Sequence, residues 1–147
     1  MAGYSVRGEV VDVKEPDLVV IREQSGMKTE VQLAKVQALV EGQELYQEAL
    51  DFMREKFMGT EVVAFLIEER RPVGYVGEVR VVMDVDLGEL LLRLGYALPD
   101  PATGEKYVGS EVLMAAVREH LGMWSQERPV APWEYKKRGE AAECAQE

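Results

Sequence analysis

The order of the predicted secondary structure elements limits the fold more than any other feature of this sequence. Stretches rich in β-branched residues alternate with turn signals such as "KEPD", which contains Pro16, and this alternation is typical of meandering strands. One amphipathic pattern, residues 41–58, interrupts the series after the third strand and stops at Gly59, which predicts a helix. The strands are expected at residues 5–13, 18–23, 28–36, 60–69 and 74–83.

Two further helices are predicted after the last strand. A stripe of leucines in residues 86–95 ends at Gly95, which indicates a short helix. Ser110 can cap a third helix, in which apolar residues as far as Trp124 share one face with His120. We therefore expect His120 to be a hydrogen-bonded residue of the core or its boundary.

Five strands with a helix between the third and fourth predict an α+β, mainly β fold. This order matches the five-stranded, partly open Greek-key barrel called the OB-fold, here followed by two further C-terminal helices. A chain of 147 residues is most economically one domain. We expect this domain to cover residues 1–137, and the charged residues 138–147 to form a disordered tail.

The composition excludes several kinds of active site. His120 is the only histidine and Cys144 the only cysteine, so a histidine-rich or cysteine-rich metal site, paired-histidine catalysis and an internal disulfide are excluded. Carboxylates remain as candidates for acid, base or metal chemistry. The 27 acidic and 17 basic residues give a net charge of −10, which counts against non-specific binding to nucleic acid.

The sequence also predicts where the protein is found. The start "MAGYSVRGEV" has no basic region followed by an apolar one, as a secretory signal would have, and no run of about 18 apolar residues suggests a membrane span. We therefore expect a cytoplasmic protein without a membrane partner.

Several fragments, in this order along the chain, resemble one known family. They are "DLVVI", "VQLAKV", "GQELYQEALDFMREKFMGTEV", "DLGELLLRLGYA" and "LGMWSQERPVAPWEY". Together they resemble the staphylococcal nuclease-like family of thermonuclease domains, over roughly residues 5–136. The most specific fragment is the "LGMW…P…PWEY" ending after a helix. The resemblance implies an OB-fold barrel with two further helices, in agreement with the pattern described above.

The resemblance also implies a mechanism for active members of the family. Such members have Asp-Gly-Asp-Thr at the first hairpin, Arg-Leu-x-x-Ile/Val-Asp-x-Pro-Glu after the third strand and Tyr-Gly-Arg at the last hairpin. Their carboxylates hold one calcium ion, their glutamate assists an attacking water, and their two arginines stabilise charge on the phosphate. A hard cation needs oxygen ligands, and a phosphoryl transition state needs fixed positive charge.

This sequence departs from the family pattern at most of those positions. Asp17 keeps one metal-ligand carboxylate and is the only one of five charged positions to keep its charge. The other matching positions hold Gln32 and Tyr75 for the arginines, Gln37 for the metal-binding aspartate, Ala38 for the threonine, Leu39 for the proline and Val40 for the glutamate. Loss of a general base alone costs about 10²- to 10⁴-fold in rate, so the family reaction should not run here.

Three functions therefore stay open at this stage. The first is a catalytically inactive nuclease-like domain, a pseudoenzyme, that binds protein or single-stranded nucleic acid at the remodelled cleft. The second is a divergent metal-dependent phosphodiesterase acting on DNA or RNA, which recruits Glu15 or Glu41 around Asp17; calcium is a possible cofactor only in that case, and otherwise no cofactor or metal is expected. The third is a nucleic-acid binder without turnover.

No catalytic residue is assigned, and Asp17 is treated as a vestigial carboxylate. Each binding candidate also has a simpler interpretation. Asp17 could be a local backbone acceptor, and Lys35 and Gln37 could be solvent-facing residues at a strand end. Arg70 and Arg71, with the rings of Tyr75 and Tyr107, could form a basic and aromatic platform for a nucleotide, or the arginines could be a solvated hairpin tip. The binding candidates are Lys35, Gln37, Arg70, Arg71, Tyr75 and Tyr107.

Overall fold

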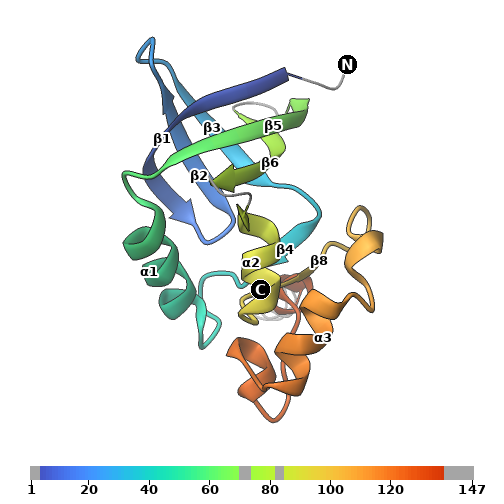
Figure 1. Ribbon diagram of the computed structural model, residues 1–147. Helices are drawn as coiled ribbons and strands as arrows, with labels where there is room; N and C mark the ends of the chain where they lie inside the picture. The colour runs from blue at the N-terminus through green and yellow to red at the C-terminus, as the bar shows by residue number, and fades with distance from the viewer. Residues whose placement is uncertain (1–3, 70–73, 82–84, 138–147) are drawn as a thin grey trace, which may run out of the picture.

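Five strands close into a barrel in the computed structural model, which describes residues 4–69, 74–81 and 85–137 (Figure 1). The barrel strands are β1 (Tyr4–Glu15), β2 (Leu18–Glu23), β3 (Lys28–Leu33), β5 (Glu61–Glu69) and β6 (Tyr75–Val81). β1 pairs antiparallel with β2 and β5, β2 with β3, and β5 with β6. A parallel pairing of β3 with β6 closes the ring. The expected α+β, mainly β barrel with OB-fold connectivity is confirmed.

The remaining elements lie mainly at one end of this barrel (Figure 1). Helix α1 (Tyr46–Phe57) lies between the third and fourth barrel strands, as expected. The others are β4 (Val36–Ala38), β7 (Val85–Asp86), α2 (Leu87–Arg93), β8 (Ala97–Pro99) and α3 (Glu111–Arg118), with 3-10 turns at Glu105–Tyr107 and Gly122–Ser125 and helical residues at 132–137. β4 and β8 form a separate two-stranded sheet, and β7 extends the barrel sheet beside β6.

Buried, mostly apolar side chains fill the interior of the barrel; they alternate with more exposed ones on β5, whereas Val19, Val20 and Ile21 are buried in succession on β2. On β5, for example, Val62, Ala64 and Leu66 are buried, while Phe65 and Ile67 between and beyond them are exposed. The core continues from the barrel into helices α1 and α2, where Met53, Phe57, Leu91 and Leu92 are buried.

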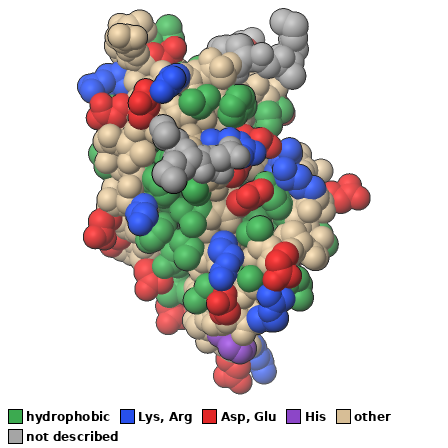
Figure 2. Space-filling view, viewed as in Figure 1, with side chains coloured by type: hydrophobic (Ala, Val, Ile, Leu, Met, Phe, Trp, Pro, Cys, Tyr) green, Lys and Arg blue, Asp and Glu red, His purple; other side chains and the backbone are tan. Residues whose placement is uncertain are grey.

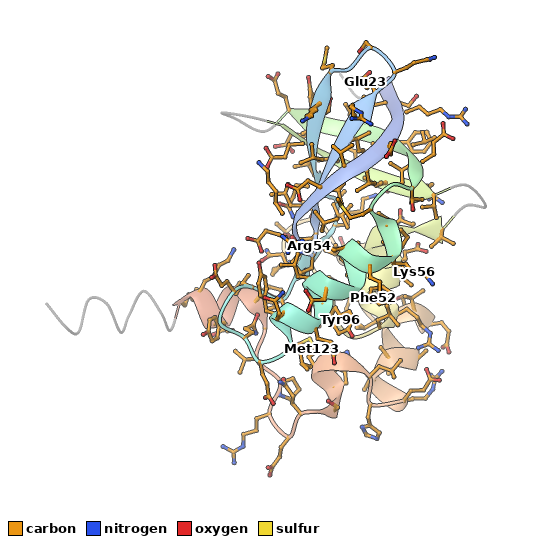
Figure 3. The ribbon with its side chains drawn as sticks, turned by 90° about the vertical axis from the view of Figure 1, so that its left-hand side faces the viewer. Glu23, Phe52, Arg54, Lys56, Tyr96 and Met123 are labelled. Carbon is orange, nitrogen blue, oxygen red and sulfur yellow. The ribbon has the colours of Figure 1, made fainter. Side chains whose placement is uncertain are left out.

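Helix α1 is tied both to the barrel and to the C-terminal part. Arg54 Nε donates to the carbonyl oxygen of Val13 at 3.1 Å. On the other side, the rings of Phe52 and Tyr96 lie 6.1 Å apart between their centroids, and the Tyr96 hydroxyl donates to Glu48 at 3.0 Å (Figure 3). The helix therefore joins two parts of the molecule that are distant in sequence.

The boundaries of β3, α1 and α3 differ from those expected. β3 ends at Leu33, because Lys35 has a left-handed backbone with φ of 69° that turns the chain into β4. Helix α1 begins at Tyr46 and not at residue 41, since residues 41–45 form turns and the Gln43 side chain accepts a hydrogen bond from Val40 N at 2.9 Å.

The third helix is also shorter than predicted, and the prediction for His120 is wrong. Helix α3 ends at Arg118, and His120 adopts a left-handed φ of 54° and is exposed. The helical spacing of apolar residues continued through this turn because Leu121 and Trp124, in the segment that follows, are also partly buried. Periodicity alone did not show the break.

Some expectations concern residues that the structure does not describe, or are only partly tested by it. The predicted tail, residues 138–147, lies outside the described residues, as do Arg70 and Arg71. Across the described parts of the chain, the helices are too short or too polar to cross a bilayer. The cytoplasmic location stays a prediction.

The C-terminal part packs against the rest of the protein where the backbones of Gly95 and Gly122 lie in contact. Met123 N donates to Gly95 O at 2.9 Å, and a Cβ added to Gly95 would lie 2.1 Å from Leu121 O. Gly95 also has a left-handed φ of 78°, so a side chain here would be both strained and blocked.

This contact predicts unequal effects of two glycine substitutions. Gly95→Ala should lower the free energy of unfolding by at least about 3 kcal/mol, because backbone strain and a steric clash add together. Gly109→Ala is the control, since Gly109 has a similar φ of 74° but open space around it; strain alone should cost about 1–2 kcal/mol. Urea unfolding of both variants measures the difference, and equal losses would contradict the proposed close contact.

Candidate functional site

A cleft of about 800 Å³ lies at the end of the barrel where β4 leaves it. Its walls come from five parts of the chain: the β1–β2 turn, the end of β3 with residues 35–41, the adjoining ends of β5 and β6, the loop after β8, and the helical residues near Tyr135. Figure 3 shows the helical segment 132–137 beside the loop that leads into α1. The cleft therefore exists only when distant segments have come together.

Asp17 joins the first two of these parts, the β1–β2 turn and the segment that runs from β3 into β4. Its carbonyl oxygen accepts from Leu33 N at 2.8 Å and from Gln32 Nε2 at 3.1 Å, which ties the β1–β2 turn to β3. Its carboxylate accepts from Ala38 N at 3.1 Å, which ties the same turn to β4. Burial raises the pKa of Asp17 above its usual value, although hydrogen bonds from Ala38 and Gln32 oppose the shift.

Lys35 lines the cleft with its charge already paired. Its Nζ lies 3.1 Å from Glu78 Oε1, and both side chains are partly buried. Burial acts to raise the pKa of Glu78, but the hydrogen bond and positive charge of Lys35, with the charge of Arg80, lower it below its usual value. The ion pair fixes the turn after β3 against β6.

Gln37 also lines the cleft, and its amide is used in an internal hydrogen bond. Gln37 Nε2 donates to Asp100 Oδ2 at 2.8 Å, and Asp100 Oδ1 accepts from the backbone N–H groups of Ala102 and Thr103. Burial acts to raise the pKa of Asp100, but these hydrogen bonds lower it below its usual value. The contact joins β4 to the loop after β8.

The two tyrosines among the binding candidates have different environments. Tyr75 is half-buried, pairs with Val31 where β6 meets β3, and packs against the core. Tyr107 is only 5% exposed, and its hydroxyl donates to Glu89 at 3.3 Å. The hypothesis that Tyr107 offers an exposed ring for stacking is therefore wrong, because the ring belongs to the core.

Among the residues that the structure describes, the lining of the cleft is more acidic than basic. The side chains that line it include five carboxylates and two lysines, namely Glu15, Asp17, Glu41, Glu68 and Asp100 against Lys35 and Lys136. Glu15 accepts from the Tyr46 hydroxyl at 2.7 Å, and burial together with this hydrogen bond raises the pKa of Tyr46 to about 12. In the part of the chain that the structure describes, no three histidine, cysteine or acidic side chains are gathered closely enough to hold a metal ion.

Several lining residues could not be found from their local sequence. Glu68 lies at the end of β5, Asp100 in the loop after β8, and Tyr135 and Lys136 near the C-terminus. Lys136 belongs to a short basic run, "KKR", but nothing in that run indicates which surface it joins. Only the folded chain brings these residues to the turn at Asp17.

The chain was compared with protein families and with curated proteins. A scan against family models finds no match, and no curated protein matches the sequence. The resemblance to nuclease-like domains therefore stays a hypothesis that depends on the quoted fragments.

The environment of Asp17 predicts a dependence of stability on pH. An acid with a higher pKa in the folded protein than in the unfolded one binds more protons when folded, between those two pKa values. Its contribution to stability therefore decreases as the pH rises above the usual value of 3.8. Relative to Asp17→Asn, which carries no charge, the wild type should lose free energy of unfolding as the pH increases to neutrality.

A second substitution separates this charge effect from the hydrogen bond. Asp17→Ala leaves Ala38 N without its acceptor, which should cost about 1–3 kcal/mol relative to Asp17→Asn. Urea unfolding of the three proteins over the acid-to-neutral range measures both effects. An Asp17→Ala protein as stable as Asp17→Asn would show that the carboxyl group does not hold β4.

Proposed function

We propose that this chain is a catalytically inactive, nuclease-like OB-fold domain that binds a ligand in the cleft beside Asp17. The observation that carries the proposal is the use of the polar groups in the cleft. Asp17, Lys35 and Gln37 each make an internal contact, to Ala38, Glu78 and Asp100 respectively, while about 800 Å³ of space stays open beside them. Such a site is suited to binding and poorly equipped for a reaction.

The chemistry of the cleft supports this proposal. A calcium ion takes six to eight oxygen ligands, and its affinity increases with the number of charged ligands. Among the described residues, no three acidic side chains are gathered closely enough to share such an ion. Phosphoryl transfer also needs fixed positive charge at the phosphate, yet Gln32 and Tyr75 occupy the positions that the family resemblance assigns to arginines. Lys35, the lysine nearest these positions in sequence, is neutralised by Glu78.

The balance of charge favours a protein ligand over a nucleic acid. Among the described residues, five carboxylates and two lysines line the cleft, and this excess of negative charge would repel a phosphate backbone. The net charge of −10 adds to this repulsion at long range. A protein segment of neutral or positive charge would not be repelled in this way.

A divergent phosphodiesterase is the second candidate, since Glu15, Asp17 and Glu41 all line the same cleft. These carboxylates could hold a metal only after a rearrangement that brings them together. The candidate therefore predicts that activity requires both a divalent cation and Asp17.

A cleavage assay tests the proposal. Purified protein is incubated with single-stranded DNA and with single-stranded RNA, in the presence of calcium, magnesium or manganese. We expect no cleavage above that of a mock purification, because Val40, Gln32 and Tyr75 occupy the positions that the family resemblance assigns to the general base and the two arginines. Metal-dependent turnover that is abolished by Asp17→Ala would establish the phosphodiesterase instead.

Binding of nucleic acid without turnover is tested separately. Fluorescence anisotropy of a labelled single-stranded oligonucleotide at low salt should show no saturable binding. Saturable binding that weakens with salt, and that is lost when Arg70 and Arg71 are both replaced by glutamine, would assign the domain to nucleic acid.

A further inference from the structure

We propose that the ligand of the cleft is a basic peptide segment of a partner protein, in which a lysine or arginine lies next to an apolar side chain. This inference depends on the proposed function, because it names the ligand class of the same cleft. Four features support it: two unpaired carboxylates, a lysine held in an ion pair, apolar walls, and exposed apolar side chains on β5.

Two of the carboxylates in the cleft are available to a ligand. Glu41 and Glu68 are exposed, and the side chain of neither has a hydrogen bond or an ion pair with any residue that the structure describes. They come from different walls, Glu41 from the loop before α1 and Glu68 from the end of β5. A cation between these walls would have acidic groups on both sides.

The lysines in the cleft do little to offset this negative charge. Lys35 is held by Glu78 at 3.1 Å, and the pair is partly buried, so its charge is largely cancelled within the protein. Lys136 is exposed on the helical segment, where solvent and salt screen it. The cleft is therefore complementary to a positively charged ligand.

The walls of the cleft also suit the long stem of a lysine or arginine. Leu39 is buried, Val40 and Val76 are half-buried, and all three line the cleft. Lysine and arginine side chains pack their methylene groups on apolar surface while the charged end meets water or a carboxylate. A volume of about 800 Å³ lies within the range of about 300–1,000 Å³ that ligand sites occupy.

Exposed apolar side chains on β5, the strand that carries Glu68, give the second half of the recognition. Phe65 is 47% exposed and Ile67 is 44% exposed, and Ile67 precedes Glu68 in the chain. Val76, which lines the cleft, is paired with Glu68 across the β5–β6 hairpin. Figure 2 shows hydrophobic side chains at the surface over β1 and β5, among charged ones. We call Phe65 and Ile67 the β5 shelf.

The β5 shelf and the cleft together determine which kinds of residue the peptide should contain. A positively charged residue would lie in the cleft near Glu41 and Glu68, and a neighbouring apolar residue would cover part of the β5 shelf. Exposed aromatic and aliphatic side chains beside a polar rim are typical of protein-binding surfaces. A peptide with only charge, or with only apolar residues, would use half of the surface.

A binding experiment tests the charge recognition. The probe is a short fluorescent peptide in which arginine alternates with leucine, and anisotropy reports its affinity for the full chain. Glu41→Gln combined with Glu68→Gln should weaken binding about threefold to tenfold, since each exposed ion pair contributes up to about 1 kcal/mol. The control is Glu55→Gln combined with Glu127→Gln, which changes the net charge equally at exposed sites outside the cleft.

The position of the ligand is tested by placing a positive charge inside the cleft. Val40→Lys adds a cation at a half-buried wall residue and should also weaken binding of the arginine peptide. Urea unfolding confirms that the variant is folded. If Val40→Lys is unfolded, the Glu41 and Glu68 double variant decides the question, because its changes are at exposed positions.

The contribution of the β5 shelf has its own pair of variants. Phe65→Ser combined with Ile67→Thr should weaken the arginine–leucine peptide but leave a matched peptide of arginine and glycine unaffected. Met27→Ser is the control, because Met27 is 62% exposed at the distant β2–β3 turn. Equal effects of the shelf and control variants would remove the shelf from the proposal.

The outcomes distinguish this inference from the proposed function. Equal loss of peptide binding in the cleft double variant and its control, or no binding at low salt, overturns the basic-peptide ligand. Neither result affects the proposal of an inactive domain, which fails only if the cleavage assay shows turnover that needs Asp17. Tight binding of a matched glutamate–leucine peptide would also overturn the inference.

Discussion

The parallel pairing between β3 and β6 is the interaction on which the rest of the structure depends. It closes the barrel through Val31 with Tyr75 and Leu33 with Gly77, and it continues in the hydrogen bond from Ala34 N to Gly77 O at 2.8 Å. Gly74, just before β6, permits this closeness, since a Cβ there would lie 2.6 Å from the carbonyl oxygen of Glu30 in β3. Because the chain turns immediately after this pairing, closure also sets where β4 and the cleft begin.

The long elements of the fold could be predicted from the sequence, and the short ones could not. Five strands and the helix after the third show clear periods of two and of about 3.6 residues, which local side-chain patterns reveal. β4 and β8 have only three residues each, too few for a pattern, and they exist because Val36–Ala38 and Ala97–Pro99 pair across the chain. Likewise, the turn at Lys35 depends on its ion pair with Glu78, a contact between β6 and a residue 43 positions earlier.

The candidate site was likewise predictable where its residues are close together in sequence. Residues 32–40 and Asp17 were singled out by the family resemblance, and all five segments of the cleft meet beside them. Glu68 and Asp100 were missed because an acidic residue at a strand end or in a loop carries no local signal. Tyr107 was misassigned because an aromatic residue in a polar loop looks exposed in sequence, whereas tertiary packing gave it a place in the core.

The hydrogen bond between Gln37 and Asp100 spans 63 positions of the chain, so the two walls that it joins are adjacent only in the native state. A ligand that touches both walls would therefore bind the folded protein and not the unfolded chain. By mass action, a ligand present at 100 times its dissociation constant adds about 2.7 kcal/mol to the free energy of unfolding. The amount of this protein that survives proteolysis in a cell would then follow the concentration of that ligand.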